Sequence, residues 1–303
     1  MKKKTNDCQT ILFLPLIILI FLFCACVRHE SVILPAVSDY ELAPIQEMNH
    51  LRVGVSIGPY GEMFLKGIQP SLEELGYTAE LVHFDDFVSP NFALARNHID
   101  LNIFQHYAYL NRFKFEHDLA LSAITEIPTI SMGVFSNRFR SISNLTRGIT
   151  VSIPSDPSNL ARSLVILEAA GILTLNPYIE KPKATLADIV SNPLNIRLIP
   201  IQAHHLVESL KTYDVSVING NYALSGGLHP SQALFNEILS SNYLLIVAVR
   251  TEDLSKRFAR DIIDVVHSPA FRDIITDPAG MFTDFQKPCS FYDIPFENWR
   301  NRF

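Results

Sequence analysis

The chain has 303 residues, a formal net charge of −6 at pH 7 and four cysteines. Its acidic balance, without a basic patch interleaved with aromatic residues, is not typical of a protein that binds nucleic acid. The length allows one or two folded units, and so few cysteines mean that the fold must rest on a hydrophobic core.

The first 25 residues have the organisation of an export signal. Three lysines at positions 2–4 precede an apolar run over 11–23, which is the order of segments in a secretory leader. The sequence LFCAC at 22–26 resembles a bacterial lipobox, and this resemblance implies cleavage after Ala25 and lipid attachment to Cys26. An uncleaved N-terminal anchor is the alternative. Both interpretations place the rest of the chain outside the cytoplasm.

The cysteines agree with an exported, lipid-carrying chain. Cleavage removes Cys8 and Cys24, and if Cys26 carries the lipid, Cys289 is the cysteine left over. An internal disulfide cannot then form, although the export route permits one. Residues 26–50 show no clear periodicity, and we interpret them as a tether between the lipid and the folded body.

From residue 51 onward, strand-like and helix-like segments alternate. Strands are predicted at 51–57, 80–84, 100–104, 120–124, 130–135, 149–153, 196–201, 214–218 and 243–249. Helices are predicted at 62–75, 90–97, 106–117, 157–170, 184–191, 203–212, 221–226 and 252–267. Pro70 lies inside the first helix and predicts a kink or a later start. The alternation indicates an α/β fold with parallel sheets covered by helices.

The segment PSDPSNLARSL at 154–164 predicts a helix start suited to a small carboxylate. Ser155 or Asp156 can cap the helix, and a helix start attracts anions. Asn159 and Arg162 lie three residues apart on one helical face, where the guanidinium can hold a carboxylate with two hydrogen bonds. The alternative is a capped surface helix with a solvated arginine.

Several blocks of the chain, taken in order, resemble the NlpA-type methionine-binding lipoproteins, the solute-binding components of methionine ABC transporters. The resemblance covers about residues 51 to 250, and the tail from about 280 matches less well. The blocks are FDDFVSPN (84–91), IDLNIFQHYAYL (99–110), PSDPSNLARSL (154–164), VINGNYA (217–223) and NYLLIVAVR (242–250).

The resemblance implies a two-lobed fold of the periplasmic-binding-protein type II, with two crossover strands and a ligand cleft between the lobes. We place the crossings near 128–135 and 241–249. Lobe one is then 51–132 together with 248–303, and lobe two is 133–247. The full predicted organisation adds a signal peptide at 1–25 and a lipid-anchored tether at 26–50.

The same resemblance implies a site for an amino acid, and the residues can be matched to its chemical groups. Arg162 with Asn159 suits the carboxylate. Asn219 follows the strand 214–218, at the edge where open α/β sheets place ligands, and its amide can donate or accept. A strand-end turn former is the alternative for Asn219. For the ammonium acceptor, Asn102 and Asp85 both remain open.

A thioether is apolar and polarizable and packs well against aromatic edges. The sequence offers a set of rings for such a slot, although each ring taken singly is more typical of core packing. These residues are Phe104, His106, Tyr109, Phe84 and Tyr60.

Metal binding and catalysis find little support. The adjacent pair His204 and His205 cannot face one another on a helix, and His98 falls on a different predicted element from His106. No cysteine or carboxylate cluster stands at ligand spacing, and no nucleophile is paired with a base. We therefore predict no metal, no cofactor and no enzymatic activity.

Together, these patterns and the resemblance indicate a lipid-anchored receptor that captures L-methionine and delivers it to the permease of an ABC transporter. We expect a monomer on the cell membrane or outer membrane, facing the periplasm or the exterior, with no nucleic-acid partner. Two alternatives stay open. One is a receptor for a methionine-containing dipeptide or another amino acid, which the departure at Gly220 and Asn221 leaves open. The other is a surface adhesin with a vestigial pocket.

Overall fold

The computed structural model describes residues 49–292. The predicted signal peptide, the lipid attachment at Cys26 and nearly all of the 26–50 tether lie outside the described residues. Between residues 49 and 292, no helix combines the length and the apolar character needed to cross a membrane.

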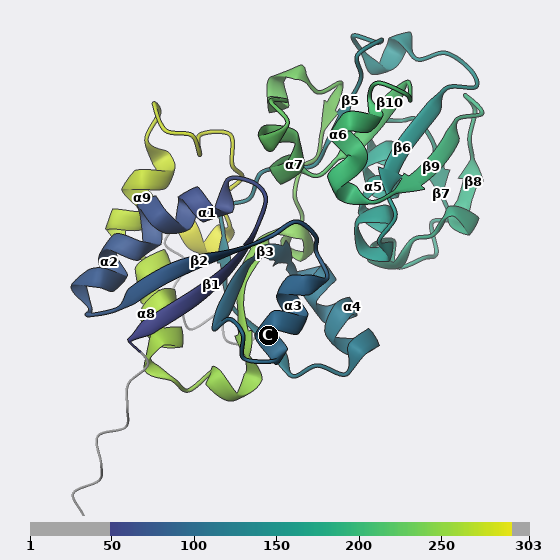
Figure 1. The fold of residues 1–303 in the computed structure, drawn as a ribbon. Helices are drawn as coiled ribbons and strands as arrows, with labels where there is room; N and C mark the ends of the chain where they lie inside the picture. Colours follow the sequence, from purple (N-terminus) through teal and green to yellow (C-terminus); the bar gives the residue numbers. More distant parts are fainter. Residues whose placement is uncertain (1–48, 293–303) are drawn as a thin grey trace, which may run out of the picture. The chain divides into compact units, whose positions relative to one another are not determined.

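The first lobe is built on a five-stranded sheet in the order β2-β1-β3-β12-β4 (Figure 1). β1 pairs in parallel with β2 and β3, whereas β12 runs antiparallel to β3 and β4. The strands are β1 (His50–Ser56), β2 (Thr78–Phe84), β3 (Leu101–His106), β4 (Leu121–Ile127) and β12 (Leu245–Arg250). The helices of this lobe are α1 (Tyr60–Met63), α2 (Gln69–Glu74), α3 (Ser89–Ala95), α4 (Tyr107–His117), α8 (Arg257–Val266) and α9 (Pro269–Thr276).

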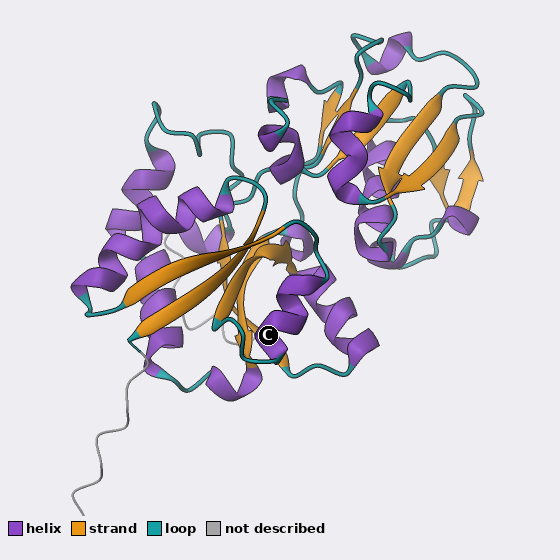
Figure 2. Ribbon diagram, in the orientation of Figure 1, coloured by secondary structure: helices purple, strands orange, loops and turns teal. Residues whose placement is uncertain are grey.

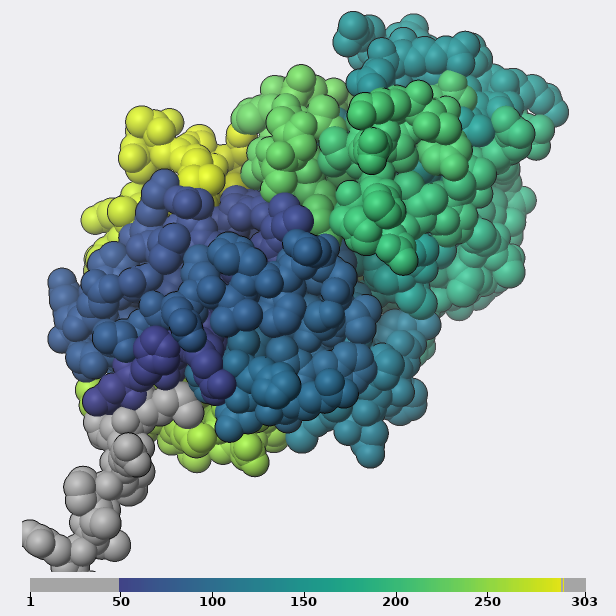
Figure 3. All heavy atoms as spheres, viewed as in Figure 1, coloured from purple at the N-terminus to yellow at the C-terminus, as the bar shows by residue number. Residues whose placement is uncertain are grey.

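Alternation along β12 shows how this sheet is covered on both faces. Leu245, Val247 and Val249 belong to the core shared with α1, α2, α8 and α9. Ile246 and Ala248 belong to a second core shared with α3 and α4. Because successive side chains of a strand point to opposite faces, one buried apolar strand contributes to both cores. Residues from both ends of the described chain meet in this lobe, purple-blue beside yellow in Figure 3.

The second lobe is built on another five-stranded sheet, whose strands are drawn in orange in Figure 2. The strand order is β11-β5-β10-β6-β9. β6 pairs in parallel with β10 and β9, and β5 runs antiparallel to β10 and β11. The strands are β5 (Gly133–Phe135), β6 (Thr150–Pro154), β9 (Arg197–Ile201), β10 (Val215–Ile218) and β11 (Phe235–Asn236), with a small hairpin of β7 (Thr174–Leu175) and β8 (Ile189–Ser191). The helices are α5 (Pro157–Ala169), α6 (Leu206–Ser209) and α7 (Gly220–Ser225).

The chain passes between the two sheets twice. It leaves the first sheet at the end of β4, crosses over 128–132 and enters the second sheet at β5. It returns over 237–244, between β11 and β12. This is the predicted two-lobed α/β architecture with two crossings. The prediction of parallel sheets is wrong in part, because β12 in the first sheet and β5 and β11 in the second pair antiparallel with their neighbours. The predicted lobe boundaries, 51–132 with 248–303 and 133–247, stay a prediction.

The helix predicted at 184–191 is wrong. A single 3-10 turn, Leu186–Asp188, forms there, and the next residues pair as β8 with β7. The side chains of Thr185 and Asp188 cap this turn reciprocally, so the local hydrogen bonds are satisfied after one turn. The helix predicted at 252–267 begins only at Arg257, and α9, which Ser268 caps, was not predicted.

The interruption predicted at Pro70 is confirmed. The first helical segment is α-helical over Tyr60–Met63, π-helical over Phe64–Ile68 and α-helical again over Gln69–Glu74. Pro70 occupies the first turn of the last piece, where the missing N–H of proline costs least.

Candidate functional site

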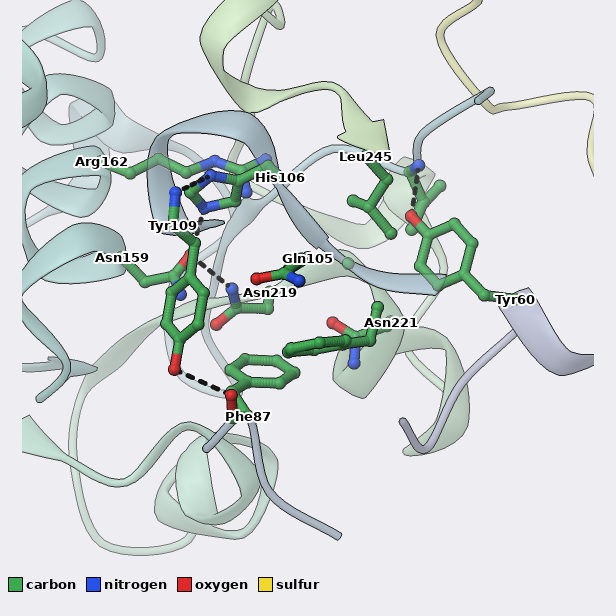
Figure 4. Close-up of a pocket in the computed structure, with 13 residues that line it drawn as sticks. Tyr60, Phe87, Gln105, His106, Tyr109, Asn159, Arg162, Asn219, Asn221 and Leu245 are labelled. Atoms are coloured by element: carbon green, nitrogen blue, oxygen red, sulfur yellow. Dashed lines mark hydrogen bonds between the residues drawn. The ribbon is translucent and has the colours of Figure 1, made fainter. Parts of the chain in front are cut away.

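A small cavity lies between side chains of the two lobes. Figure 4 shows Arg162 and His106 at one end of the drawn residues and Phe87 at the other, with Tyr60 to one side. The cavity therefore has a polar end and an aromatic end.

Seven of the nine side chains predicted to bind a ligand line this cavity. They are Tyr60, Phe104, His106, Tyr109, Asn159, Arg162 and Asn219. The lining residues that sequence reasoning did not select are Phe87, Gln105, Ile130, Gly220, Asn221 and Leu245. The fold brings the seven together, and their contact with a ligand stays a prediction.

Phe84 and Asn102 do not line the cavity. The Phe84 ring packs against the core of α3 and β12. Asn102 lies two residues deeper in β3 than Phe104 and is fully buried. Its Nδ2 donates to Oδ1 of Asn91 at 3.1 Å, and its Oδ1 accepts from Nε2 of Gln105 at 3.0 Å. Both polar atoms of the Asn102 side chain are therefore bonded within the protein. Asp85, the other candidate for the ammonium acceptor, is also outside the lining.

Strand ends and helix starts position the polar residues of the cavity. His106 ends β3 and caps α4, because its Nδ1 accepts from the backbone N–H of Tyr109 at 3.1 Å. Asp156 caps α5 by accepting from the backbone N–H of Asn159 at 2.9 Å. Asn219 stands between β10 and α7. Ligands of α/β proteins gather at this kind of edge.

Backbone N–H groups fix the direction of the hydrogen bonds among these side chains. Because Nδ1 of His106 accepts from a backbone donor, the neutral ring carries its proton on Nε2. That Nε2–H donates to Oδ1 of Asn159 at 3.2 Å. At the other end, Nδ2 of Asn159 donates to both oxygens of Asp156 at 3.1 Å. The hydrogen bonds to His106 and to Asp156 therefore both orient the Asn159 amide with its Oδ1 toward His106.

The amide of Asn219 is oriented by the same network. Its Nδ2 donates to Oδ1 of Asn159 at 2.9 Å (Figure 4). Its Oδ1 is buried and has no hydrogen-bond partner among the described residues. A buried acceptor without a partner costs free energy, and this one belongs to a cavity-lining residue. The cavity therefore offers an unpaired acceptor to a ligand that carries a donor.

His106 is neutral in the folded protein. Burial, reinforced by the positive charge of Arg162, lowers the pKa of His106 from its ordinary value to about 3. Both ring nitrogens are engaged by protein groups. His106 therefore presents a ring face or edge to the cavity and positions Asn159 through its polar atoms.

Arg162 is paired inside the protein with Glu237, which the sequence analysis did not find. Nε of Arg162 lies 2.8 Å from Oε1 of Glu237, and Nη2 lies 2.5 Å from Oε2. Both side chains are buried, with exposed fractions of 4% and 6%. Burial lowers the pKa of Arg162, but the charge and hydrogen bonds of Glu237 outweigh this and hold it above its ordinary value. Nη1 of Arg162 has no hydrogen bond to a described residue.

Two further contacts hold this ion pair. The guanidinium lies 5.0 Å from the centre of the Tyr243 ring, a cation–π arrangement. Oε2 of Glu237 also accepts from the backbone N–H of Met132 at 3.2 Å. Glu237 and Met132 belong to the two crossing segments. Because Glu237 stands 75 residues from Arg162 in the chain, no local pattern could reveal the pair.

The aromatic end of the cavity is formed by rings of the first lobe. Phe87 lies 6.0 Å from Phe104 and 6.3 Å from Tyr109, measured between ring centres. The Tyr109 hydroxyl donates to the carbonyl of Phe87 at 2.9 Å, which fixes the loop that carries Phe87. The block FDDFVSPN contains this residue, but the sequence could not tell that Phe87 rather than Phe84 faces the cavity.

No group of three or more histidine, cysteine or acidic residues that could hold a metal ion occurs within residues 49–292. The ring centres of His204 and His205 lie 4.0 Å apart. The expectation that these two residues stay apart is therefore wrong, because they lie in a 3-10 turn, Ala203–His205, and not in an α-helix.

Comparison with known proteins identifies the family. The profile described as NlpA lipoprotein matches residues 51–286. The chain belongs to the NlpA lipoprotein family. A family relative named D-methionine-binding lipoprotein MetQ, from Yersinia pestis, is 31% identical over 223 residues, which cover 73% of this chain and 82% of the relative. Outer membrane lipoprotein 2 of Mannheimia haemolytica is 33% identical over 207 residues, covering 67% of this chain and 74% of that protein.

Solved structures agree with this family and with the fold. A nutrient binding protein from Burkholderia cenocepacia, bound to methionine, superposes with a TM-score of 0.71 at 30% identity and covers 75% of this chain and 95% of that one. A crystal structure of the methionine binding protein MetQ gives a TM-score of 0.71 at 29% identity, with 75% and 94% coverage. The resemblance stated from the sequence blocks is therefore confirmed.

Proposed function

We propose that this NlpA-family chain is an extracytoplasmic, lipid-anchored solute-binding protein. It captures methionine in the cavity between its lobes and delivers it to the permease of an ABC transporter. The observation that carries the proposal is the pairing, in one small cavity, of a fixed guanidinium with a wall of aromatic rings. Family membership and a methionine-bound relative support the same assignment.

Each group of the amino acid has a counterpart in the cavity. Nη1 of Arg162 receives the carboxylate, because Nε and Nη2 are already held by Glu237. The thioether packs among Phe87, Phe104 and Tyr109, since sulfur favours aromatic edges. Asn159, whose amide is used on both ends, positions its neighbours.

We also assign Cys26 as the lipidated residue and 26–50 as the tether. We expect a monomer without enzymatic activity. The name of the Mannheimia relative, an outer membrane lipoprotein, supports an anchored location.

Calorimetry tests the function. The mature protein is unfolded and refolded to remove carried-over ligand, then titrated with L-methionine and D-methionine. We expect a dissociation constant of about 1 µM or tighter for at least one of them, or about −8 kcal/mol. Arg162→Lys should weaken binding by about 100-fold, because a lysine cannot hold both Glu237 and a ligand carboxylate in the same geometry. Arg147→Lys, an exposed position in the same lobe, is the matched control. No heat and no thermal shift with either isomer would refute the proposal.

A further inference from the structure

The charge balance at the polar end of the cavity restricts the ligand. Arg162 is the one formally charged side chain among the described residues that line the cavity, and Glu237 pairs with it at 2.5–3.1 Å. The two side chains are each more than nine-tenths buried. The protein therefore presents a guanidinium whose positive charge is already balanced.

A carboxylate that reaches Arg162 brings a second negative charge to this buried pair. Net charge in a buried site is costly unless it is compensated. None of the lining residues supplies another cation. The compensating positive charge must therefore come with the ligand itself.

An independent observation places that positive charge. Oδ1 of Asn219 is a buried acceptor without a partner among the described residues. It cannot turn away, because the Asn219 amide donates to Asn159, and the Asn159 amide is anchored at both ends by groups that cap helices. Those capping groups, His106 and Asp156, take their direction from backbone N–H groups.

We propose that Glu237 is a specificity-determining residue that makes the cavity select zwitterions, with Asn219 as the acceptor for the ligand's ammonium group. Net-neutral 2-amino acids bind, and their 2-oxo analogues, which keep the carboxylate and side chain but lack the positive charge, are rejected. This inference rests on the proposed function and adds the charge class of the ligand.

A purely structural role for Glu237 makes a different prediction. Glu237 also accepts from the backbone of Met132 in the other crossing segment, so its loss could simply loosen the protein. A loosened protein would bind all ligands more weakly by a similar factor. Charge selection instead changes the ratio between a zwitterion and an anion of the same shape.

The first test uses the full mature protein and two probes, methionine (the isomer that binds) and 4-methylthio-2-oxobutanoate. Calorimetry should give a preference for methionine of about 100-fold or more, as expected where a built polar site meets an analogue that lacks the matching group. Equal affinities within threefold would overturn the inference and leave the proposed function standing. If neither probe binds, the proposed function fails and this inference fails with it.

The second test replaces the carboxylate by a near-isostere. Glu237→Gln should bind the 2-oxo acid at least tenfold more tightly than the wild type does, and the preference for methionine should fall by at least tenfold. Glu168→Gln is the matched control, because Glu168 pairs with Lys181 on the surface of the same lobe. An unchanged ratio in Glu237→Gln would overturn the inference.

A second variant keeps the test sharp if Glu237→Gln does not fold. Asn219→Leu removes the acceptor without altering the ion pair. It should weaken the binding of methionine at least tenfold and the binding of the 2-oxo acid less than threefold. Equal weakening of both probes would contradict the role of Asn219.

Discussion

The two walls of the cavity come from different lobes and differ in chemistry. The second lobe supplies Arg162, Asn159 and Asn219, whose side chains are oriented by hydrogen bonds within the protein. The first lobe supplies mainly rings, including Phe87, Phe104 and Tyr109. The second lobe is thus built to recognise the part that all amino acids share, and the first lobe the part that distinguishes them. Variants in the two walls should therefore fail in different ways.

The largest effect is expected in the second lobe, at the buried ion pair. Arg162→Met leaves Glu237 buried without its partner and should lower the free energy of unfolding by about 3–5 kcal/mol, measured by urea denaturation. The double variant Arg162→Met with Glu237→Leu should recover much of that loss but bind no methionine. A double variant as unstable as the single one would contradict this account of the pair.

The next effect distinguishes the rings of the first lobe. Phe87→Leu should weaken methionine about tenfold, because it removes an aromatic face from the wall, and should leave the preference for methionine over the 2-oxo acid unchanged. Phe84→Leu is the control, since Phe84 packs in the core instead. It should lower stability and leave affinity as it is. Calorimetry measures the affinity of each variant, and thermal unfolding measures its stability. If Phe84→Leu weakened methionine binding and Phe87→Leu did not, the aromatic wall would be misassigned.

The contact between the two walls makes stability depend on pH. Burial and the nearby Arg162 lower the pKa of His106 to about 3, so below pH 6.5 the unfolded chain binds a proton that the folded chain does not. Stability should therefore fall as the pH drops from 6.5, by about 2 kcal/mol at pH 5 from this group. His106→Gln should show a shallower fall in urea denaturation. His267, whose pKa is also lowered by burial, leaves some dependence in both proteins. Identical slopes would rule out a neutral His106.

The smallest effect is expected at the helix cap behind the polar wall. Asp156→Ala should cost about 1 kcal/mol of stability and weaken methionine a few-fold, because Nδ2 of Asn159 loses its acceptor. Asp156→Ser should restore the cap and most of the stability. Asp188→Ala, at a capped turn in the same lobe, should leave affinity unchanged. If that control weakened methionine equally, the effect would not belong to the cap of α5.

Local signals explain what the sequence predicted of this site. The start of α5 carries its own cap, and the fold places Asn159 and Arg162 on the cavity as the pattern indicated. Asn219 was selected through the resemblance of its block to the family, because a strand-end asparagine taken alone is more typical of a turn. Glu237 was missed because its role depends on a contact across 75 residues. Phe84 was selected in place of Phe87 because an aromatic residue in a block does not show which face it takes.

The fold shows the same limit. The alternation of strands and helices predicted the α/β class, the resemblance to the family predicted the two lobes, and Pro70 predicted the interrupted first helix. The antiparallel strands β5, β11 and β12 were not predicted. The segment 184–191 has helix-compatible composition, yet its capped turn and pairing with β7 decide otherwise. Tertiary pairing overrides local propensity there.

A crystal structure of the protein with methionine would test the division between the walls most directly. We expect the ligand carboxylate on Nη1 of Arg162, the ammonium on Oδ1 of Asn219 and the thioether among Phe87, Phe104 and Tyr109. A ligand bound with its ammonium toward Arg162 and Glu237, or with its side chain outside the rings, would contradict it.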